Sequence, residues 1–179
     1  MKDLLEILAA MAGKRREVDS PRDLFLDMAE RVVKNVCSSF GTKADEVAIL
    51  FLTSDARHLR FVAPRKFADL GTIPVTKRDS IAVNVLGRGV GEALNNVPTV
   101  KHVAFFESVK LRDRVVPIQK MITVPIVSRG ESVGVAQVSR KGETPAAAGP
   151  DFTNADVRRA QEIFEAVAPY LVQARPEPF

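Results

Sequence analysis

The chain has 179 residues, of which 46% are apolar and 27% are charged, and its formal net charge is +4. That length and composition are ordinary for one globular domain with a single hydrophobic core. Charges of both signs are interspersed, and the densest basic run, Lys-Arg-Arg at residues 14–16, is typical of a solvated helix end. Nucleic-acid binding is therefore not favoured.

Cysteine occurs once, at Cys37, which excludes an intramolecular disulfide and a thiolate metal cluster within one chain. A reducing compartment fits this usage. Near the N-terminus, Asp3, Glu6 and Lys14 interrupt the apolar positions, which is typical of neither a signal peptide nor a membrane span. We expect a cytoplasmic protein without membrane association.

Two helix patterns occupy the first 40 residues. Residues 1–13 place leucines and alanines at helical spacing, but about three turns of helix are marginal alone in water, so this segment needs a partner surface. The second pattern starts at Ser20 and Pro21, which suit the cap and the first helical position, and its apolar period continues to Phe40. The spacing predicts a helix that covers a sheet.

A β-rich region follows. Residues 47–53 are continuously apolar and β-prone, which predicts a central strand covered on both faces. Turn-forming residues 54–56 and the alternation over residues 57–63 predict a hairpin with that strand.

A short helix is expected after the hairpin, capped by Asp79 or Ser80 and running through Leu86. The glycines of residues 87–91 end it, and a short strand follows at 92–94. Exposed glycine amides can also hold a phosphate. In a phosphate-binding loop, however, the glycines follow a strand and precede a helix, whereas here they follow a helix and precede a strand. A helix end is favoured.

Residues 95–117 show no clean period and exceed the usual connection length, which is typical of a lid or binding loop. The clearest hairpin of the chain comes next. It joins β-rich runs at 121–127 and 132–139 through the polar turn at 128–131.

The last predicted element is a long helix. Thr153 and Asp156 occupy capping-box positions before it. Pro169 removes a backbone donor, so we expect a kink or fraying near residues 166–168.

The sequence of residues 21–172 resembles the GAF family of regulatory domains. The resemblance rests on the hairpin runs Ile122–Val127 and Val133–Val138 with the turn at 129–131, and on Phe152-Thr153 with Asp156 and the helix to Tyr170. Ser80 to Asn95 is similar to the short helix and strand beside the family's pocket.

The resemblance implies an α+β, GAF-like and PAS-related fold. A central antiparallel sheet of five to six strands would carry terminal helices on one face and a loop-covered pocket on the other. We divide the chain into an N-terminal helical extension (1–19), a GAF-like domain (20–173) and a C-terminal tail (174–179).

By the same resemblance the pocket lies under the loops at residues 77–116. Two aromatic residues of this region would close above the ligand, although hydrophobic closure of the sheet is the alternative for them. The expected ligand-binding residues are Asp79, Ser80, Asn84, Arg88, Asn95, Phe105 and Phe106.

Members of the family bind cyclic nucleotides, tetrapyrroles, small metabolites or partner proteins. We therefore expect a regulatory sensor that binds an unidentified small molecule or a signalling partner; a ligand-free dimerisation or scaffold module and a cryptic enzyme are the alternatives. The chain lacks the Asn-Lys-Phe-Asp-Glu signature of cyclic-nucleotide binders and the lid cysteines of bilin-binding and methionine-sulfoxide-reducing members. No cofactor is identified.

Catalytic and metal signals are weak. Cys37 sits on or beside the buried stripe of its helix, where a free cysteine acts as a small hydrophobe. His58 and His102 are scattered and lack matching carboxylates, so no metal site is expected. Since no nucleophile elbow or paired-carboxylate signature occurs either, we do not expect an enzyme.

A homodimer through the terminal helices is also expected. The first helix exposes an apolar face, and the closing helix has a narrow apolar seam of the kind used in helix pairing. The alternative is that the first helix folds back onto its own sheet. The closing-helix residues concerned are Val157, Ala160, Ile163, Phe164, Val167, Tyr170 and Leu171.

Overall fold

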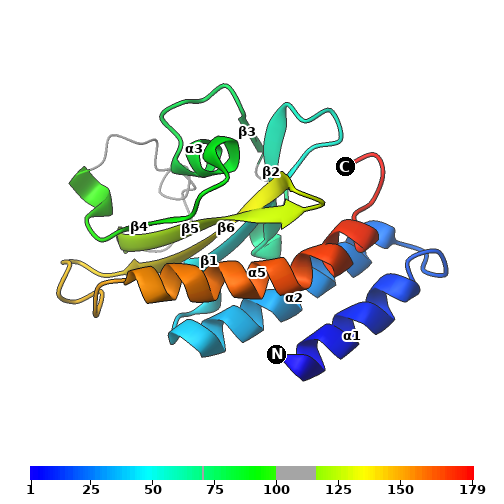
Figure 1. The fold of residues 1–179 in the computed structure, drawn as a ribbon, viewed down its shortest axis with the longest axis horizontal. Helices are drawn as coiled ribbons and strands as arrows, with labels where there is room; N and C mark the ends of the chain where they lie inside the picture. Colours follow the sequence, from blue (N-terminus) through cyan, green and yellow to red (C-terminus); the bar gives the residue numbers. More distant parts are fainter. Residues whose placement is uncertain (70, 100–115) are drawn as a thin grey trace.

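The computed structural model describes residues 1–69, 71–99 and 116–179 (Figure 1). Three one-turn 3-10 helices, η1 (Ala44–Glu46), η2 (Arg65–Phe67) and η3 (Val97–Thr99), connect its main elements. The helices are α1 (Lys2–Gly13), α2 (Pro21–Phe40), α3 (Ile81–Arg88) and α5 (Asn154–Ala174). The strands are β1 (Val47–Leu52), β2 (His58–Ala63), β3 (Thr72–Pro74), β4 (Glu92–Leu94), β5 (Ile118–Ser128) and β6 (Glu131–Lys141).

The six strands form one antiparallel sheet in the order β3-β2-β1-β6-β5-β4. The β5–β6 hairpin is longer than the sequence predicted, since each strand has 11 residues. At its turn Arg129 and Gly130 have φ values of 53° and 82°, the left-handed pair that a two-residue hairpin loop needs. The expected sheet of five to six strands is confirmed.

Helices cover the two faces of the sheet unequally. Figure 1 shows α1, α2 and α5 together on one face, here called the helical layer, and α3 on the other. The larger core lies under the helical layer, where Phe25 and Phe164 meet the β5 side chains Ile122, Val124 and Ile126. Because strand side chains alternate between faces, the residues between these three point toward α3.

The predicted caps of α2 and α5 are confirmed. Ser20 Oγ accepts a hydrogen bond from the Asp23 N–H at 3.2 Å, and Gly41 closes α2 in the left-handed conformation. At α5 the Thr153 N–H donates to Asp156 Oδ2 at 2.8 Å, and the Asp156 N–H donates to Thr153 Oγ1 at 3.2 Å. These bonds satisfy backbone donors that a helix start leaves free.

Fraying of α5 near Pro169 was a wrong expectation, because the helix runs unbroken to Ala174. Pro169 is exposed, and so is Glu165, whose carbonyl loses its helical partner and can bond water instead. Neighbouring Val167 and Leu171 are fully buried against the core. Tertiary packing therefore keeps this turn helical.

The first helix folds back within the chain, against α5 and α2 and not against the sheet. Leu4, Leu8 and Ala12 are buried there, with exposed fractions of 9%, 0% and 2%. Of the α5 seam, all residues except the half-buried Tyr170 are buried in the same core. The apolar surface that motivated the homodimer is thus covered, and the dimer itself stays a prediction without that support.

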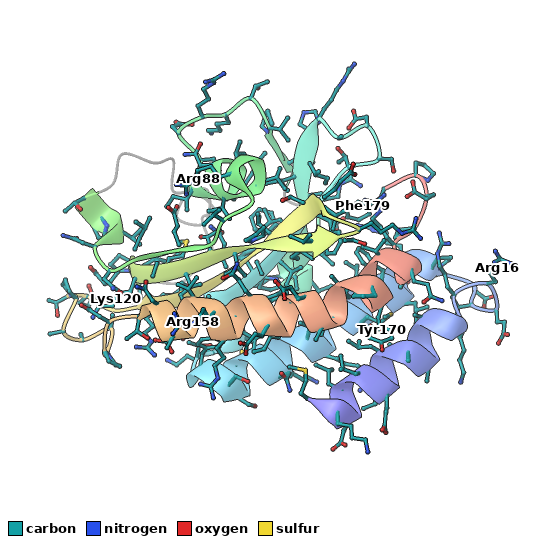
Figure 2. All side chains as sticks on the ribbon, in the orientation of Figure 1. Arg16, Arg88, Lys120, Arg158, Tyr170 and Phe179 are labelled. Atoms are coloured by element: carbon teal, nitrogen blue, oxygen red, sulfur yellow. The ribbon has the colours of Figure 1, made fainter. Side chains whose placement is uncertain are left out.

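The C-terminal tail lies against the domain near the β1–β2 turn. The Ser54 N–H donates to the Phe179 carbonyl at 3.0 Å, and the Phe179 N–H donates to Ser54 Oγ at 2.8 Å. The Phe179 ring stands edge-to-face on the Phe25 ring, with the two ring centroids 5.4 Å apart (Figure 2 labels Phe179).

None of the helices within the described ranges has the length and apolar character needed to cross a bilayer.

Candidate functional site

Two separate apolar clusters occupy the sheet face that points toward α3. The first joins β1, β2, β3 and β6 to α3 and includes Leu50, Phe61 and Val85. The second is smaller, lies at the β4–β5 edge beside η3, and consists of Leu94, Val97, Ile118 and Met121.

Buried polar side chains lie between the two clusters. Thr123 on β5 is directly opposite Gln137 on β6, and Gln137 is in turn opposite Ala48 of the first cluster. Ser139 follows Gln137 on the same face. Thr123, Gln137 and Ser139 are 1%, 6% and 5% exposed; we call these three residues the polar strip.

The hydrogen bonds of the polar strip leave capacity unused. Gln137 Nε2 donates to Thr123 Oγ1 at 3.2 Å and to Met121 Sδ at 3.1 Å, and a thioether is a weak acceptor. Among the described residues, no donor bonds Gln137 Oε1. Ser139 differs, because its hydroxyl donates to the Glu46 carbonyl at 2.9 Å.

A cavity of about 10 Å³ adjoins the polar strip, between β1, β5, β6 and η1. That is about the space of a single water. Both Gln137 and Ser139 line it, with Met121 and Ile118 on its apolar side.

The cationic side chains of β5 and β6 are engaged away from the polar strip. Lys120 Nζ bonds Asp151 Oδ1 at 2.7 Å and the Gly149 carbonyl at 2.6 Å, in the loop before α5 (Figure 2). Lys141 Nζ bonds Asp45 Oδ2 at 2.8 Å, and the Arg140 guanidinium stacks 4.3 Å from a phenylalanine ring centroid. Charged residues nevertheless adjoin the polar strip: Glu92 on β4 is directly opposite Thr123, and Asp45 and Glu46 line the cavity beside Gln137 and Ser139.

The α3 residues expected to bind ligand lie on one side of that helix, four residues apart. Ser80 caps α3 and accepts from the Val83 N–H at 3.4 Å. Asn84 is exposed, and Arg88 pairs with Glu92 at 2.6 Å. None of the three belongs to the polar strip, but Glu92, the partner of Arg88, lies directly opposite Thr123.

The remaining expected residues lie elsewhere. Asp79 is exposed before α3. Both ends of the Asn95 carboxamide bond the main chain of Phe152: Nδ2 donates to its carbonyl at 2.9 Å, and Oδ1 accepts from its N–H at 2.8 Å. Phe105 and Phe106 lie outside the described residues. Their roles in ligand binding, and those of the α3 residues, stay predictions.

Sequence reasoning missed Thr123 and Gln137. The available signal was a polar residue at an alternate position of each strand, with aliphatic residues on both sides: Ile122 and Val124 flank Thr123, and Ala136 and Val138 flank Gln137. A polar residue on the covered face of a strand is informative, because burying it is costly unless it finds a partner.

Other candidate chemistry is not assembled. The described ranges contain no group of three or more histidine, cysteine or acidic residues that could hold a metal. Cys37 is half-buried against the helical layer, and burial raises the pKa of its thiol. His58 is partly buried on β2, His102 lies outside the described residues, and Gly89 ends α3 in the left-handed conformation, as the helix-end interpretation predicted.

No family model matches the sequence, and neither does any curated protein. Several solved structures are similar to this chain in fold. The GAF domain of a phosphoenolpyruvate-protein phosphotransferase from Coxiella burnetii is 14% identical with a TM-score of 0.64, covering 96% of this chain and 94% of that chain. Residues 122 to 287 of a methyl-accepting chemotaxis protein are 16% identical with a TM-score of 0.62, covering 92% and 96%.

A third similar structure is an enzyme. The type II free methionine-R-sulfoxide reductase from Thermoplasma acidophilum is 18% identical with a TM-score of 0.61, covering 85% of this chain and 95% of that chain. Together these similarities show that the chain has the fold of GAF domains.

Proposed function

We propose that this chain is a regulatory sensor domain that binds a small molecule on the sheet face opposite the helical layer. Similar folds in a phosphotransferase GAF domain and in a chemotaxis protein support a signalling context. The polar strip is the observation that supports this location of the binding site. A protein whose only task was to fold would gain by filling both faces of this sheet with aliphatic residues.

The contrast between the two faces of β5 and β6 supports this. Toward the helical layer, these strands present only aliphatic side chains among their central residues, such as Ile122, Val124 and Val138. Toward α3, the same strands bury Thr123 and Gln137. The two side chains bond each other, and Gln137 Oε1 still has acceptor capacity that a bound ligand would use.

Binding is favoured over reductase chemistry by the position of Cys37. This is the chain's one cysteine, and it packs on α2 against the core under the helical layer. The sheet separates it from the polar strip, so its sulfur is remote from a ligand bound there. Its raised pKa also favours the thiol over the reactive thiolate at neutral pH.

The test has two parts. Mass spectrometry of denatured purified protein detects a carried small molecule, and a thermal-shift screen of a chemically broad metabolite set detects one that binds on addition. A ligand at one hundred times its Kd stabilises the folded state by about 2.7 kcal/mol. If no compound is carried and none stabilises the protein, the sensor proposal fails and a ligand-free scaffold replaces it.

A further inference from the structure

We propose that the polar strip selects uncharged ligands that present a donor and an acceptor side by side, as a cyclic amide does. Thr123 and Gln137 are its specificity-determining residues. This inference rests on the proposed function and names the ligand class for that same site.

The chemistry of Gln137 suits a cyclic amide. A primary carboxamide carries an acceptor oxygen and a two-proton nitrogen side by side, so it can pair with a cis-amide edge through two hydrogen bonds. Its Nε2 spends one contact on the weak acceptor Met121 Sδ, and Oε1 has no donor among the described residues. A lactam N–H would donate to Oε1, and a lactam carbonyl would replace the weak acceptor Met121 Sδ at Nε2.

Thr123 holds the Gln137 carboxamide in place. Its hydroxyl accepts from Gln137 Nε2 at 3.2 Å, which fixes the carboxamide relative to the sheet. Hydroxyl hydrogens rotate, so the same group can still donate to a ligand acceptor. The pair therefore provides one carboxamide edge and one adjacent hydroxyl, both held on neighbouring strands.

The charges around the polar strip disfavour an anionic ligand. A carboxylate or phosphate placed on this face would lose its hydration, and an unpaired buried ion is strongly disfavoured. Lys120 and Lys141, on the strands of the strip, are already bonded to Asp151 and Asp45. Arg88 is paired with Glu92, the residue directly opposite Thr123, and the Glu92 carboxylate would repel an anion placed there. An uncharged ligand avoids this penalty.

A second buried glutamine provides the matched control. Gln119 on β5 is 5% exposed, like Gln137, but its Nε2 donates to the Gly142 carbonyl at 2.8 Å. That bond anchors the loop after β6. The Gln119 side chain is therefore structural, whereas Gln137 bonds a hydroxyl and a weak thioether acceptor and no main-chain group among the described residues.

The experiment uses two pairs of probes on the full chain, with binding measured by ligand-observed NMR titration. Uracil is compared with its carboxylated form orotate, and 2-piperidone with its ring-opened zwitterion 5-aminopentanoate. We expect each neutral lactam to bind at least tenfold more tightly than its charged counterpart. Q137L and T123V are expected to weaken lactam binding at least tenfold, and Q119L to change it less than twofold.

Stability measurements accompany the titrations. Q137L removes a bond to a hydroxyl that can rotate and one to a weak thioether acceptor, whereas Q119L leaves the Gly142 carbonyl without its donor, so Q119L should lower the denaturant midpoint more than Q137L does. T123V is nearly isosteric and keeps the test valid should Q137L fail to fold.

The outcomes separate the two proposals. If charged probes bind as tightly as lactams, or if lactams bind Q137L and T123V as they bind wild type, the ligand class is wrong while the sensor function stands. If neither series binds, the ligand class is again wrong, and the broad thermal-shift screen decides whether the sensor function fails with it.

Discussion

Thr123 and Gln137 lie directly opposite each other on β5 and β6, and the Gln137 carboxamide donates to the Thr123 hydroxyl at 3.2 Å. The preceding pair of this ladder, Ile122 and Val138, is fully buried under the helical layer. Two consecutive positions thus serve different purposes: one closes the core, and the next places a polar pair on the other face. Several properties of the molecule follow from the packing around this sheet.

The first helix should be part of the cooperative fold. Leu8 is fully buried between α1 and the rest of the helical layer, so Leu8→Ala is expected to lower the free energy of unfolding by about 2 to 5 kcal/mol. Ile7, its neighbour, is 41% exposed, and Ile7→Ala should change stability by only about 0.5 kcal/mol. Urea unfolding followed by circular dichroism measures both. Equal, small effects would mean that α1 is a detachable extension.

The pairing of β1 with β6 should depend on Gly134. A Cβ there would lie 2.3 Å from the Leu50 carbonyl oxygen, on backbone that cannot yield without opening the ladder. Gly134→Ala should therefore cost at least about 1 to 3 kcal/mol. Gly87→Ala is the control, since that position in α3 is open and helical, and it should gain about 0.5 to 1 kcal/mol. Thermal unfolding that ranks the two variants the other way would contradict the register.

The α5 cap should make stability depend on acid. Main-chain and side-chain hydrogen bonds from Thr153 lower the pKa of Asp156 below 3.8, its ordinary value. A depressed folded-state pKa stabilises the protein above pH 3.8 and loses that contribution as pH falls through the folded value. Asp156→Asn should cost about 1 kcal/mol at neutral pH and flatten the acid limb of the stability curve.

The control for this measurement is Asp79→Asn, which alters an exposed aspartate before α3. Its stability curve should follow that of the wild type. An Asp156→Asn curve parallel to wild type down to pH 2 would show that the cap does not titrate as described.

The two asparagines expected to bind ligand, Asn84 and Asn95, should contribute differently to the stability of the fold. The Asn95 carboxamide makes two bonds to the Phe152 main chain, so Asn95→Ala should destabilise the fold by about 1 to 3 kcal/mol. Asn84 is exposed, and Asn84→Ala should leave stability within about 0.5 kcal/mol of wild type. Chemical denaturation gives both values. A stable Asn95→Ala variant would return that side chain to the list of free ligand-binding groups.

Cys37 should react slowly in the folded protein. Burial raises the pKa of its thiol, and the thiolate is the reactive form. A chromogenic disulfide reagent at pH 7 should therefore modify native protein much more slowly than protein in denaturant, and the native rate should rise with pH. A native rate equal to the denatured rate at pH 7 would rule out the buried, protonated thiol and would reopen the case for cysteine chemistry.

Local signals predicted most of the fold. The caps at Ser20 and Thr153 depend on neighbours three residues away, and the sequence places those neighbours directly. The two hairpins followed from alternation and turn residues. The fold class followed from the order of these elements and from the resemblance they carried.

The pairing of Thr123 with Gln137 could not be predicted in the same way. At the hairpin turn Ser128 is opposite Glu131, but a bulge between Ile126 and Val127 shifts the register by one residue. Carried on without the bulge, the register would place Thr123 opposite Ala136. A bulge is a local backbone adjustment whose position depends on packing at the surrounding strands, which the sequence pattern does not reveal.

The remaining differences depend on contacts between distant segments. Asn95 meets Phe152 across 57 residues, so its carboxamide could not be recognised as structural from local sequence. The apolar seam of α5 is covered by α1, α2 and the sheet, and a single helix pattern cannot distinguish such cover from a second chain. Both cases depend on which surfaces meet after folding.

The most direct test of the binding face is a two-dimensional NMR titration of the labelled chain with the tightest compound from the thermal-shift screen. We predict that the side-chain amide of Gln137 and the methyl of Thr123 shift first and saturate with the binding curve, while resonances of Leu8 and Ile163 in the helical layer stay unchanged. Saturating shifts centred on the helical layer, with Gln137 and Thr123 unmoved, would contradict this prediction.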